Sequence, residues 1–535
     1  MSLRTWASVP KPGLWLATVA GGLQALSVAW PGSGQAHGWL QVLSLAILAS
    51  GLVRLADPQA GQHSFFTSLH LDGDRPLRGV LRAAAWRTAA FAVAWLAGVF
   101  WWLHVSMHQV GGLPAPLSVA AVLLLALALG LYYVGAATLW VALVRAARWG
   151  QRPWAASVLF AALWLLAELL RGRWFTGFPW GAGGYAHVDS WLAPLAPWLG
   201  VYGMGALAAL VAMRLAWPQR RVRAGLLMAV CLFGLRFLPD NGQLTQSAGR
   251  AEVELLQANI SQTDKFEAGR GVRDALQWYG ERLLASGQPL VVAPETAVPV
   301  LPRHLPPGYW QALKDHYAKG QQLALVGMPW GDAVQGYSNS LVALGSAGQA
   351  DYRYDKFHLV PFGEFIPTGF GWFVRQMQIP LGDFARGSVH QPSIEWQGQR
   401  LAPNICYEDL FGEELAARFG SGEQPPTALV NVSNIAWFGD TVAVDQHLNI
   451  SRLRAMELGR PMLRATNTGA TAIIDHRGQV QGLLPRFTRG SLMGTFEGRT
   501  GLTPYTRWVA AFGLWPLWGL ALLVVVWAGW SARRR

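Results

Sequence analysis

Cys406 stands at the end of a short apolar run, in the stretch Leu-Ala-Pro-Asn-Ile-Cys-Tyr-Glu-Asp-Leu that covers residues 401–410. A free cysteine usually behaves as a small buried hydrophobe, and only a specific electrostatic environment makes it reactive. Tyr407, Glu408 and Asp409 follow it directly. Taken alone, this stretch favours a structural cysteine, so other parts of the chain must decide whether Cys406 does chemistry.

Two charged residues upstream change that balance. Glu295 directly follows the buried-strand pattern of residues 290–294, and Lys356 lies in the segment 352–364. A carboxylate can take the thiol proton, and burial raises the pKa of a glutamate toward the range that suits a general base. A lysine ammonium and backbone N–H groups can stabilise the resulting oxyanion. Each residue alone would be interpreted as a helix cap or a solvated charge, but Glu295, Lys356 and Cys406 together predict thioester chemistry.

The composition of the 535-residue chain indicates a membrane protein. It is 52% hydrophobic and 14% charged, with 28 tryptophans, whereas an ordinary soluble domain is about 25% charged. We ascribe the net charge of +13 to basic cytoplasmic loops and attraction to anionic lipid. There is no zinc-finger spacing and no phosphate-binding loop, so no nucleic-acid partner is expected. Because only Cys231 and Cys406 are present, neither a disulfide nor a metal site is expected, and no cofactor is implied.

Apolar runs long enough, or nearly long enough, to cross a bilayer occupy residues 13–30, 39–55, 83–105, 117–144, 155–170, 191–213, 224–238 and 509–530. The first run could be a signal peptide, but no Ala-x-Ala cleavage site follows it, which favours a retained span. We therefore expect a polytopic α-helical bundle of about eight spans. Basic residues follow alternate runs, so the positive-inside rule places both termini in the cytoplasm and residues 239–508 outside it.

The loop at residues 168–180 departs from this charge pattern, because it places Arg171 and Arg173 on the non-cytoplasmic side. One interpretation is a locally neutralised loop. The other is a membrane-surface site in which one of these arginines meets a phosphate, with Trp180 and its aromatic neighbours at headgroup depth.

Between about residues 249 and 498, short apolar runs alternate with helical patterns, which indicates a layered α/β domain. Strands are expected over residues 253–259, 290–294, 323–327 and 428–433, and helices over 272–285 and 446–457. The aromatic segment 363–384 is interpreted as a surface lid or an arm that dips into lipid. The resulting division is a membrane domain (1–245), an extracytoplasmic catalytic domain (246–498) and a last span with a basic tail (499–535).

Several stretches resemble the bacterial apolipoprotein N-acyltransferases, which belong to the nitrilase (carbon–nitrogen hydrolase) superfamily. They include Thr-Gly-Phe-Pro-Trp at 176–180, Pro-Glu at 294–295, Asp-Lys-Phe-His-Leu-Val-Pro-Phe-Gly-Glu at 355–364, Ile-Cys-Tyr-Glu at 405–408, Ala-Trp-Phe-Gly at 436–439 and Gln-His at 446–447. Further matches lie at 167–172 and 452–467. The resemblance covers nearly the whole chain and implies an αββα sandwich with a Glu-Lys-Cys triad.

The resemblance also implies a reaction. Cys406 would take the sn-1 acyl chain of a phospholipid, such as phosphatidylethanolamine, as a thioester. The α-amino group of a diacylglyceryl-cysteine apolipoprotein would then accept it, which is the last step of bacterial lipoprotein maturation. Glu295 would be the base and Lys356 the oxyanion partner. The implied supporting residues are Glu364, Tyr407 and Glu408, and the implied substrate-binding residues are Phe266, Trp437, Arg171, Arg173 and Trp180.

The expected enzyme is a monomer in the inner membrane, with its catalytic domain on the periplasmic side. Two positions depart from the family pattern, because Ile435 replaces a common aspartate and Phe266 a common tryptophan. A membrane-tethered amidase is the alternative enzyme, although one anchor would suffice for it. A transporter or binding scaffold is a third interpretation, but the spans carry few acidic residues beyond Glu168, whereas ion-coupled transporters need charges at the midplane.

Overall fold

The computed structural model describes residues 11–534, apart from 58–75, 218–220, 263–270, 333, 335, 347–351, 368, 370, 372–383, 421 and 423. The chain forms two compact units. The helical unit consists of Met1–Trp101, Pro116–Leu238 and Leu514–Arg535, and the α/β unit of Trp102–Ala115 and Pro239–Gly513. The domain boundaries at residues 245 and 498 that the sequence suggested stay a prediction.

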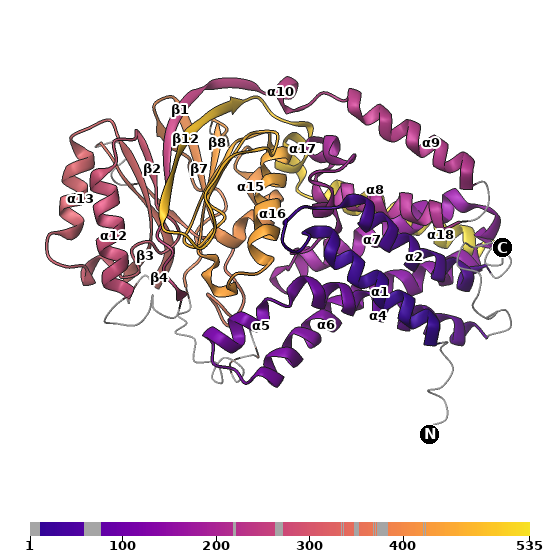
Figure 1. Ribbon diagram of the computed structural model, residues 1–535. Coiled ribbons are helices and arrows are strands. Elements are labelled where there is room, and N and C mark those ends of the chain that lie inside the picture. The colour runs from indigo at the N-terminus through magenta and orange to yellow at the C-terminus, as the bar shows by residue number, and fades with distance from the viewer. Residues whose placement is uncertain are drawn as a thin grey trace. The chain divides into compact units, whose positions relative to one another are not determined.

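The helical unit contains long apolar helices near each of the expected runs (Figure 1). They are α1 (Lys11–Val28), α2 (Gly38–Ala56), α4 (Leu77–Phe100), α6 (Ala115–Ala146), α7 (Pro153–Arg173), α8 (Ala196–Ala216), α9 (Arg221–Gly234) and α18 (Trp515–Arg533). Among the described residues, six helical segments are long and apolar enough to cross a membrane. The apolar helix at Gly13–Val28 is shorter, and α9 has 14 residues. The chain is therefore a multi-span membrane protein, and its number of spans stays approximate.

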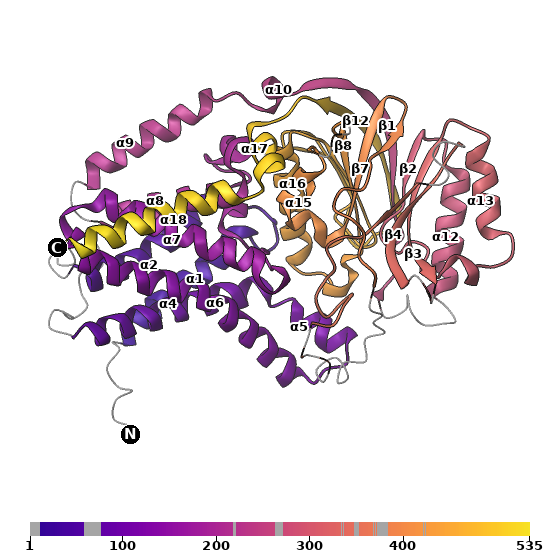
Figure 2. The ribbon, with the colours of Figure 1, turned by 180° about the vertical axis from the view of Figure 1, so that it is seen from behind.

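The last expected run is divided in the structure. Helix α17 (Pro504–Phe512) belongs to the α/β unit and ends at Gly513, whose φ of 56° no other residue type adopts as readily. Helix α18 then starts at Trp515, with a proline in its first turn, and lies beside α7 (Figure 2). The apolar run therefore contributes one helix to each unit.

The α/β unit contains two mixed six-stranded sheets. The first sheet has the order β12-β1-β2-β3-β4-β5, formed by β1 (Gln246–Gln257), β2 (Leu290–Val292), β3 (Leu323–Asp332), β4 (Gly336–Leu344), β5 (Arg353–Asp355) and β12 (Gly490–Thr500). The second has the order β11-β10-β9-β8-β7-β6, formed by β6 (Ile394–Trp396), β7 (Gln399–Ile405), β8 (Ala428–Ser433), β9 (Met462–Thr466), β10 (Ala472–Ile474) and β11 (Val480–Leu483).

Helices cover the outer faces of the two sheets (Figure 1). Helices α12 (Gly271–Ala285) and α13 (Tyr309–Ala318) lie on the first sheet, and α15 (Gly412–Ala417) and α16 (Ala443–Leu458) lie on the second. Short helices α5 (Leu103–Val105) and α10 (Asn241–Leu244) complete the unit's α-helices in the described part of the chain. The expected αββα sandwich is confirmed.

Side chains that alternate along the strands contribute to two separate hydrophobic cores, one between the sheets and one beneath the helices of the first sheet. In β3, Leu323 and Leu325 pack between the sheets, whereas Ala324 and Val326 pack against α12 and α13. Successive side chains of a strand point to opposite faces, so a strand covered on both sides must be apolar at nearly every position. Both sheets have parallel strands at their centres, β1-β2-β3 and β7-β8-β9. Parallel strands end at the same edge of a sheet, and the carboxyl ends of β2, β7 and β8 carry the polar residues described next.

Candidate functional site

Cys406 follows β7 directly and starts a short 3₁₀ helix, Cys406–Leu410. Its φ of 53° lies in the left-handed region, which is uncommon for a residue with a side chain. The sharp turn brings the thiol out of the strand direction and leaves it partly exposed, whereas Ile405 before it is fully buried. The chain is therefore bent at the sulfur-bearing residue.

Glu408 holds this turn in place. One of its carboxylate oxygens accepts the Ile405 N–H at 2.6 Å, and the other accepts the N–H groups of Phe357 at 2.7 Å and His358 at 3.2 Å. The Tyr354 hydroxyl adds a bond of 3.0 Å to each oxygen. Burial raises the pKa of the Glu408 carboxyl, and these backbone donors oppose that shift. Glu408 thus ties the residue before Cys406 to the segment that carries Lys356.

Glu295, Lys356 and Glu364 form a buried charged cluster. Nζ of Lys356 lies 2.9 Å from Oε1 of Glu364 and 3.4 Å from Oε1 of Glu295. The amide of Asn339 donates to Oε1 of both glutamates, at 2.7 Å each. Burial disfavours the Lys356 ammonium, but Glu364 and then Glu295 outweigh it and raise its pKa. The lysine is therefore a permanent cation between two carboxylates.

The second oxygen of each glutamate is also held. Oε2 of Glu295 accepts the Asn434 N–H at 2.8 Å, and Oε2 of Glu364 accepts the Val360 N–H at 2.9 Å. Asn434 follows β8, so the sheet that carries Cys406 also contacts the expected base. This contact brings the carboxyl ends of β2 and β8 together.

The electrostatic environment of the thiol joins Cys406 to this cluster. Burial and the Glu295 carboxylate raise the pKa of Cys406 to about 12, against the opposing effect of the Lys356 ammonium. The resting sulfur is therefore a protonated thiol. An attack by this sulfur requires a neighbouring acceptor for its proton, and Glu295 is the carboxylate that acts on it most strongly.

The structure thus brings together Glu295, Lys356, Cys406, Glu364 and Glu408 of the expected site residues. Tyr407 is buried and packs against Phe411, with ring centroids 5.3 Å apart. Trp437 is partly buried in the 3₁₀ turn Ile435–Phe438 that follows Asn434. Phe266 lies outside the described residues.

Arg171, Arg173 and Trp180 belong to the helical unit. Arg171 is buried and holds its own loop, because its Nη1 donates to the carbonyls of Phe178 and Trp180 at 2.8 Å each. Its Nε donates to Tyr133, and Nη2 lies 3.4 Å from Glu168.

Arg173 is exposed, in contrast to Arg171 and to the buried Trp180. Of the two arginines, Arg173 therefore has its guanidinium accessible for a phosphate.

Ile435, which stands where the family commonly has an aspartate, is buried.

The family comparisons agree with this geometry. The family model for the apolipoprotein N-acyltransferase N-terminal domain matches residues 64–214, and the carbon–nitrogen hydrolase model matches residues 254–505. An apolipoprotein N-acyltransferase from Verminephrobacter eiseniae is 52% identical and covers 97% of this chain and 96% of its own length. One from Ralstonia nicotianae is 46% identical, covering 93% and 90%. The chain belongs to the apolipoprotein N-acyltransferase family.

A weak structural likeness links the chain to an amidase of the nitrilase superfamily from Nesterenkonia AN1. The two are 16% identical with a TM-score of 0.35, and the match covers 49% of this chain and 95% of the amidase.

Sequence reasoning missed two side chains at this N-acyltransferase site, Asn339 and Ser433. Ser433 is the last residue of β8, and its hydroxyl lies 3.2 Å from the Cys406 sulfur. The expected strand at 428–433 already ended there, so the parallel-strand rule would have found it. Asn339 lies inside β4 and gave no comparable signal.

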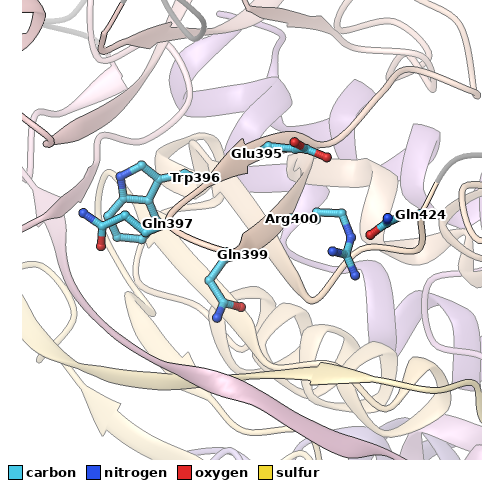
Figure 3. A pocket seen from close by; sticks show the side chains of 7 residues that line it. Glu395, Trp396, Gln397, Gln399, Arg400 and Gln424 are labelled. Carbon is cyan, nitrogen blue, oxygen red and sulfur yellow. The ribbon is translucent and has the colours of Figure 1, made fainter.

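The site shows no metal-binding chemistry in the part of the chain that the structure describes, since no group of three His, Cys, Asp or Glu side chains there could hold an ion. A polar cavity of about 400 Å³ lies at the start of β7 (Figure 3), lined by Glu395, Trp396, Gln397, Gly398, Gln399, Arg400 and Gln424. Arg400 precedes Cys406 by six positions along the strand, which is about 20 Å at the usual rise. This cavity is therefore remote from the thiol.

Proposed function

We propose that the chain transfers the sn-1 acyl chain of a membrane phospholipid, through a thioester on Cys406, to a lipoprotein. The acceptor is the N-terminal α-amino group of a diacylglyceryl-cysteine apolipoprotein, and the reaction is the last step of bacterial lipoprotein maturation. The observation that carries this proposal is the buried contact set of Glu295, Lys356 and Glu364 beside a protonated, sharply turned Cys406.

In the first step Glu295 takes the thiol proton as the Cys406 sulfur attacks the ester carbonyl carbon. Negative charge develops on the carbonyl oxygen, where the Lys356 ammonium and the backbone N–H groups after Cys406 stabilise it. The C–O bond of the ester then breaks, and the lysophospholipid alkoxide takes the proton from Glu295. The products are a thioester and a lysophospholipid.

In the second step the acceptor amine attacks the thioester carbon, and Glu295 accepts the amine proton. The C–S bond breaks with its electron pair going to sulfur, and Glu295 returns the proton to the thiolate. The amide product and the resting thiol are restored together. The same base thus serves both steps, since Glu295 returns to its ionised form at the end of each.

The other expected residues have supporting roles in this proposal. Glu364 holds Lys356, Glu408 holds the turn at Cys406, and the buried Tyr407 packs against Phe411. Substrate contacts are assigned to Trp437, Phe266 and Arg173. Of the other two residues expected to bind substrate, Arg171 is buried and holds the loop that contains the buried Trp180, so both position that loop. The exposure of Arg173 and of the neighbouring Phe175, which is 91% exposed, supports a membrane-surface phosphate contact.

We place the enzyme in the bacterial inner membrane as a monomer, with the α/β unit on the periplasmic side. The donor we propose is phosphatidylethanolamine, and neither a cofactor nor a nucleic acid takes part. The basic loops at residues 145–152 and 220–223 support this orientation.

The direct test is the mass of the purified full chain after incubation with phosphatidylethanolamine. Wild type and the Cys231→Ala variant are expected to gain one acyl group that hydroxylamine removes. Cys406→Ala is expected to gain none, because the sulfur forms the bond. Equal acylation of Cys406→Ala would refute the thioester mechanism. Hydrolysis of small amides without lipid would favour an amidase instead.

A further inference from the structure

The Ser433 hydroxyl contacts the reacting atom of the site. Its Oγ lies 3.2 Å from the Cys406 sulfur, and the side chain is fully buried. Within the described residues, this sulfur is the hydroxyl's hydrogen-bond partner and no second one is present. A buried hydroxyl needs a partner, and the Cys406 sulfur is the one that the structure places within reach.

The sheet register explains this contact. Strands β7 and β8 run parallel, and Ile405 is paired with Val432. The next residues along the two strands are Cys406 and Ser433, which therefore meet at the carboxyl edge of the sheet. The Ser433 carbonyl also accepts the Asn467 N–H at 3.1 Å, which fixes the end of β8. Ser433 is thus held in place by backbone contacts that do not involve its hydroxyl.

The charges around the sulfur give this hydroxyl a chemical task. Burial, Glu295 and Glu364 all disfavour a thiolate, whereas Lys356 and the Ser433 hydroxyl favour it and hold down the pKa of Cys406. The Lys356 ammonium is already shared between two carboxylates. Ser433 is therefore an uncharged hydrogen-bond donor that contacts the sulfur directly.

We propose that Ser433 is a further catalytic residue, which donates a hydrogen bond to the Cys406 sulfur whenever that atom carries negative charge. This inference rests on the proposed acyl transfer. When the amine attacks the thioester carbon and displaces the Cys406 thiolate, the C–S bond breaks and its electron pair moves to sulfur. The Ser433 proton stays on its oxygen and stabilises that charge, while the proton that neutralises the thiolate comes from Glu295.

The second step is expected to depend on Ser433 more than the first. A thiolate of lower pKa is a better leaving group but a weaker nucleophile. In thioester formation the larger thiolate population and the weaker nucleophilicity partly cancel. In thioester breakdown no such cancellation occurs, because the sulfur is only a leaving group.

The test compares Ser433→Ala, Ser433→Thr and Ser433→Val in a Cys231→Ser background, which leaves Cys406 as the single thiol. Threonine and valine have the same shape and differ in the hydroxyl, so that pair remains informative even where the alanine variant disturbs packing. Ser286→Ala is the matched control, since its hydroxyl donates to Glu254 rather than to the thiol. The readouts are iodoacetamide alkylation from pH 7 to 9.5, the rate of thioester formation, and the rate of transfer to an acceptor lipopeptide.

A lost hydrogen bond to a charged sulfur is expected to raise its pKa by about one unit. Alkylation and thioester formation should then slow about threefold, and transfer about tenfold, so that the acyl-enzyme accumulates. Ser433→Thr and Ser286→Ala should match wild type, and Ser433→Val should follow Ser433→Ala.

Unchanged alkylation in both Ser433→Ala and Ser433→Val would overturn the proposal. Equal losses in both acyl-transfer steps, with a wild-type alkylation profile, would also overturn it, since they indicate a structural role. Absence of a thioester in wild type would refute the acyltransferase function, whereas alkylation would still decide whether Ser433 stabilises the thiolate.

Discussion

Lys356 is bound more closely by Glu364 than by Glu295, with Nζ to Oε1 distances of 2.9 Å and 3.4 Å. Glu364 is also fixed by the Val360 N–H, so it forms a rigid anion behind the lysine. Because Glu364 carries most of the ion pair, Glu295 keeps the capacity to accept a proton. The two carboxylates therefore have different roles: Glu364 holds Lys356, the oxyanion partner, and Glu295 acts as the base.

Glu364→Gln is expected to slow thioester formation about 10- to 100-fold, a part of what a general base usually contributes. Without the Glu364 charge, Lys356 should move onto Glu295 and make it a weaker base. The rate is measured by intact mass after mixing with phosphatidylethanolamine. Glu281→Gln, on the exposed face of α12, serves as the control and should react as wild type does. A wild-type rate in Glu364→Gln would show that Glu364 does not set the basicity of Glu295.

The closeness of Glu295 and Cys406 could be predicted from the sequence, because each residue follows a strand. Glu295 comes soon after β2 and Cys406 directly after β7, and the apolar runs that form both strands are unmistakable in the sequence. Parallel strands place such residues at the carboxyl edge of their own sheet. Strands β2 and β7 belong to different sheets, so the packing of the two sheets, marked by the Asn434 N–H bond to Glu295, brings those edges together. The strand expected at 428–433 matches β8 in full.

The remaining contacts depend on packing, which spacing does not reveal. Asn339 bridges two carboxylates from the middle of β4, where an asparagine has many possible environments. Arg171 looked as available to a phosphate as Arg173, but the fold uses its guanidinium to hold the carbonyls of a sharp loop. The division of the last apolar run at Gly513 depends on one backbone angle.

Asp409→Asn is expected to destabilise the α/β unit by about 3–5 kcal/mol, because it leaves a buried cation without its anion. Asp409 lies 3.5 Å from Arg464 and 2.8 Å from Nε2 of His447, and all three side chains are buried. The free energy of unfolding in detergent measures the effect.

Asp274→Asn is the matched control for that change. Its ion pair with Arg489 is 42% exposed on both sides, and such surface pairs contribute about 0–1 kcal/mol. Equal losses in the two variants would contradict the assignment of Asp409 as the main anion of the buried network.

His447 is expected to lower stability as the pH drops below about 6.5, whereas the partly buried Glu413, whose pKa is raised to about 7, acts in the opposite direction. Burial and the Arg464 cation lower the pKa of His447 below its ordinary value of 6.5, against the effect of Asp409. The unfolded chain then binds a proton that the folded chain does not, so acid favours unfolding, by up to about 1.4 kcal/mol per pH unit. Thermal unfolding at pH 7.5 and 5.5 measures this slope. His447→Gln should reduce it, whereas exposed His390→Gln should leave it unchanged.

The orientation of the chain can be tested with a reporter that is active only outside the cytoplasm. Arg145, Arg148 and Arg152 lie around the turn between α6 and α7, and positive loops stay in the cytoplasm. A fusion after Gly242, in α10, is expected to be active, and a fusion after Arg148 inactive. An inactive Gly242 fusion with an active Arg148 fusion would reverse the topology and place Cys406 where no periplasmic lipoprotein could reach it. Activity at both positions would show that an even number of spans separates the α6–α7 loop from the α/β unit, against the three that are expected.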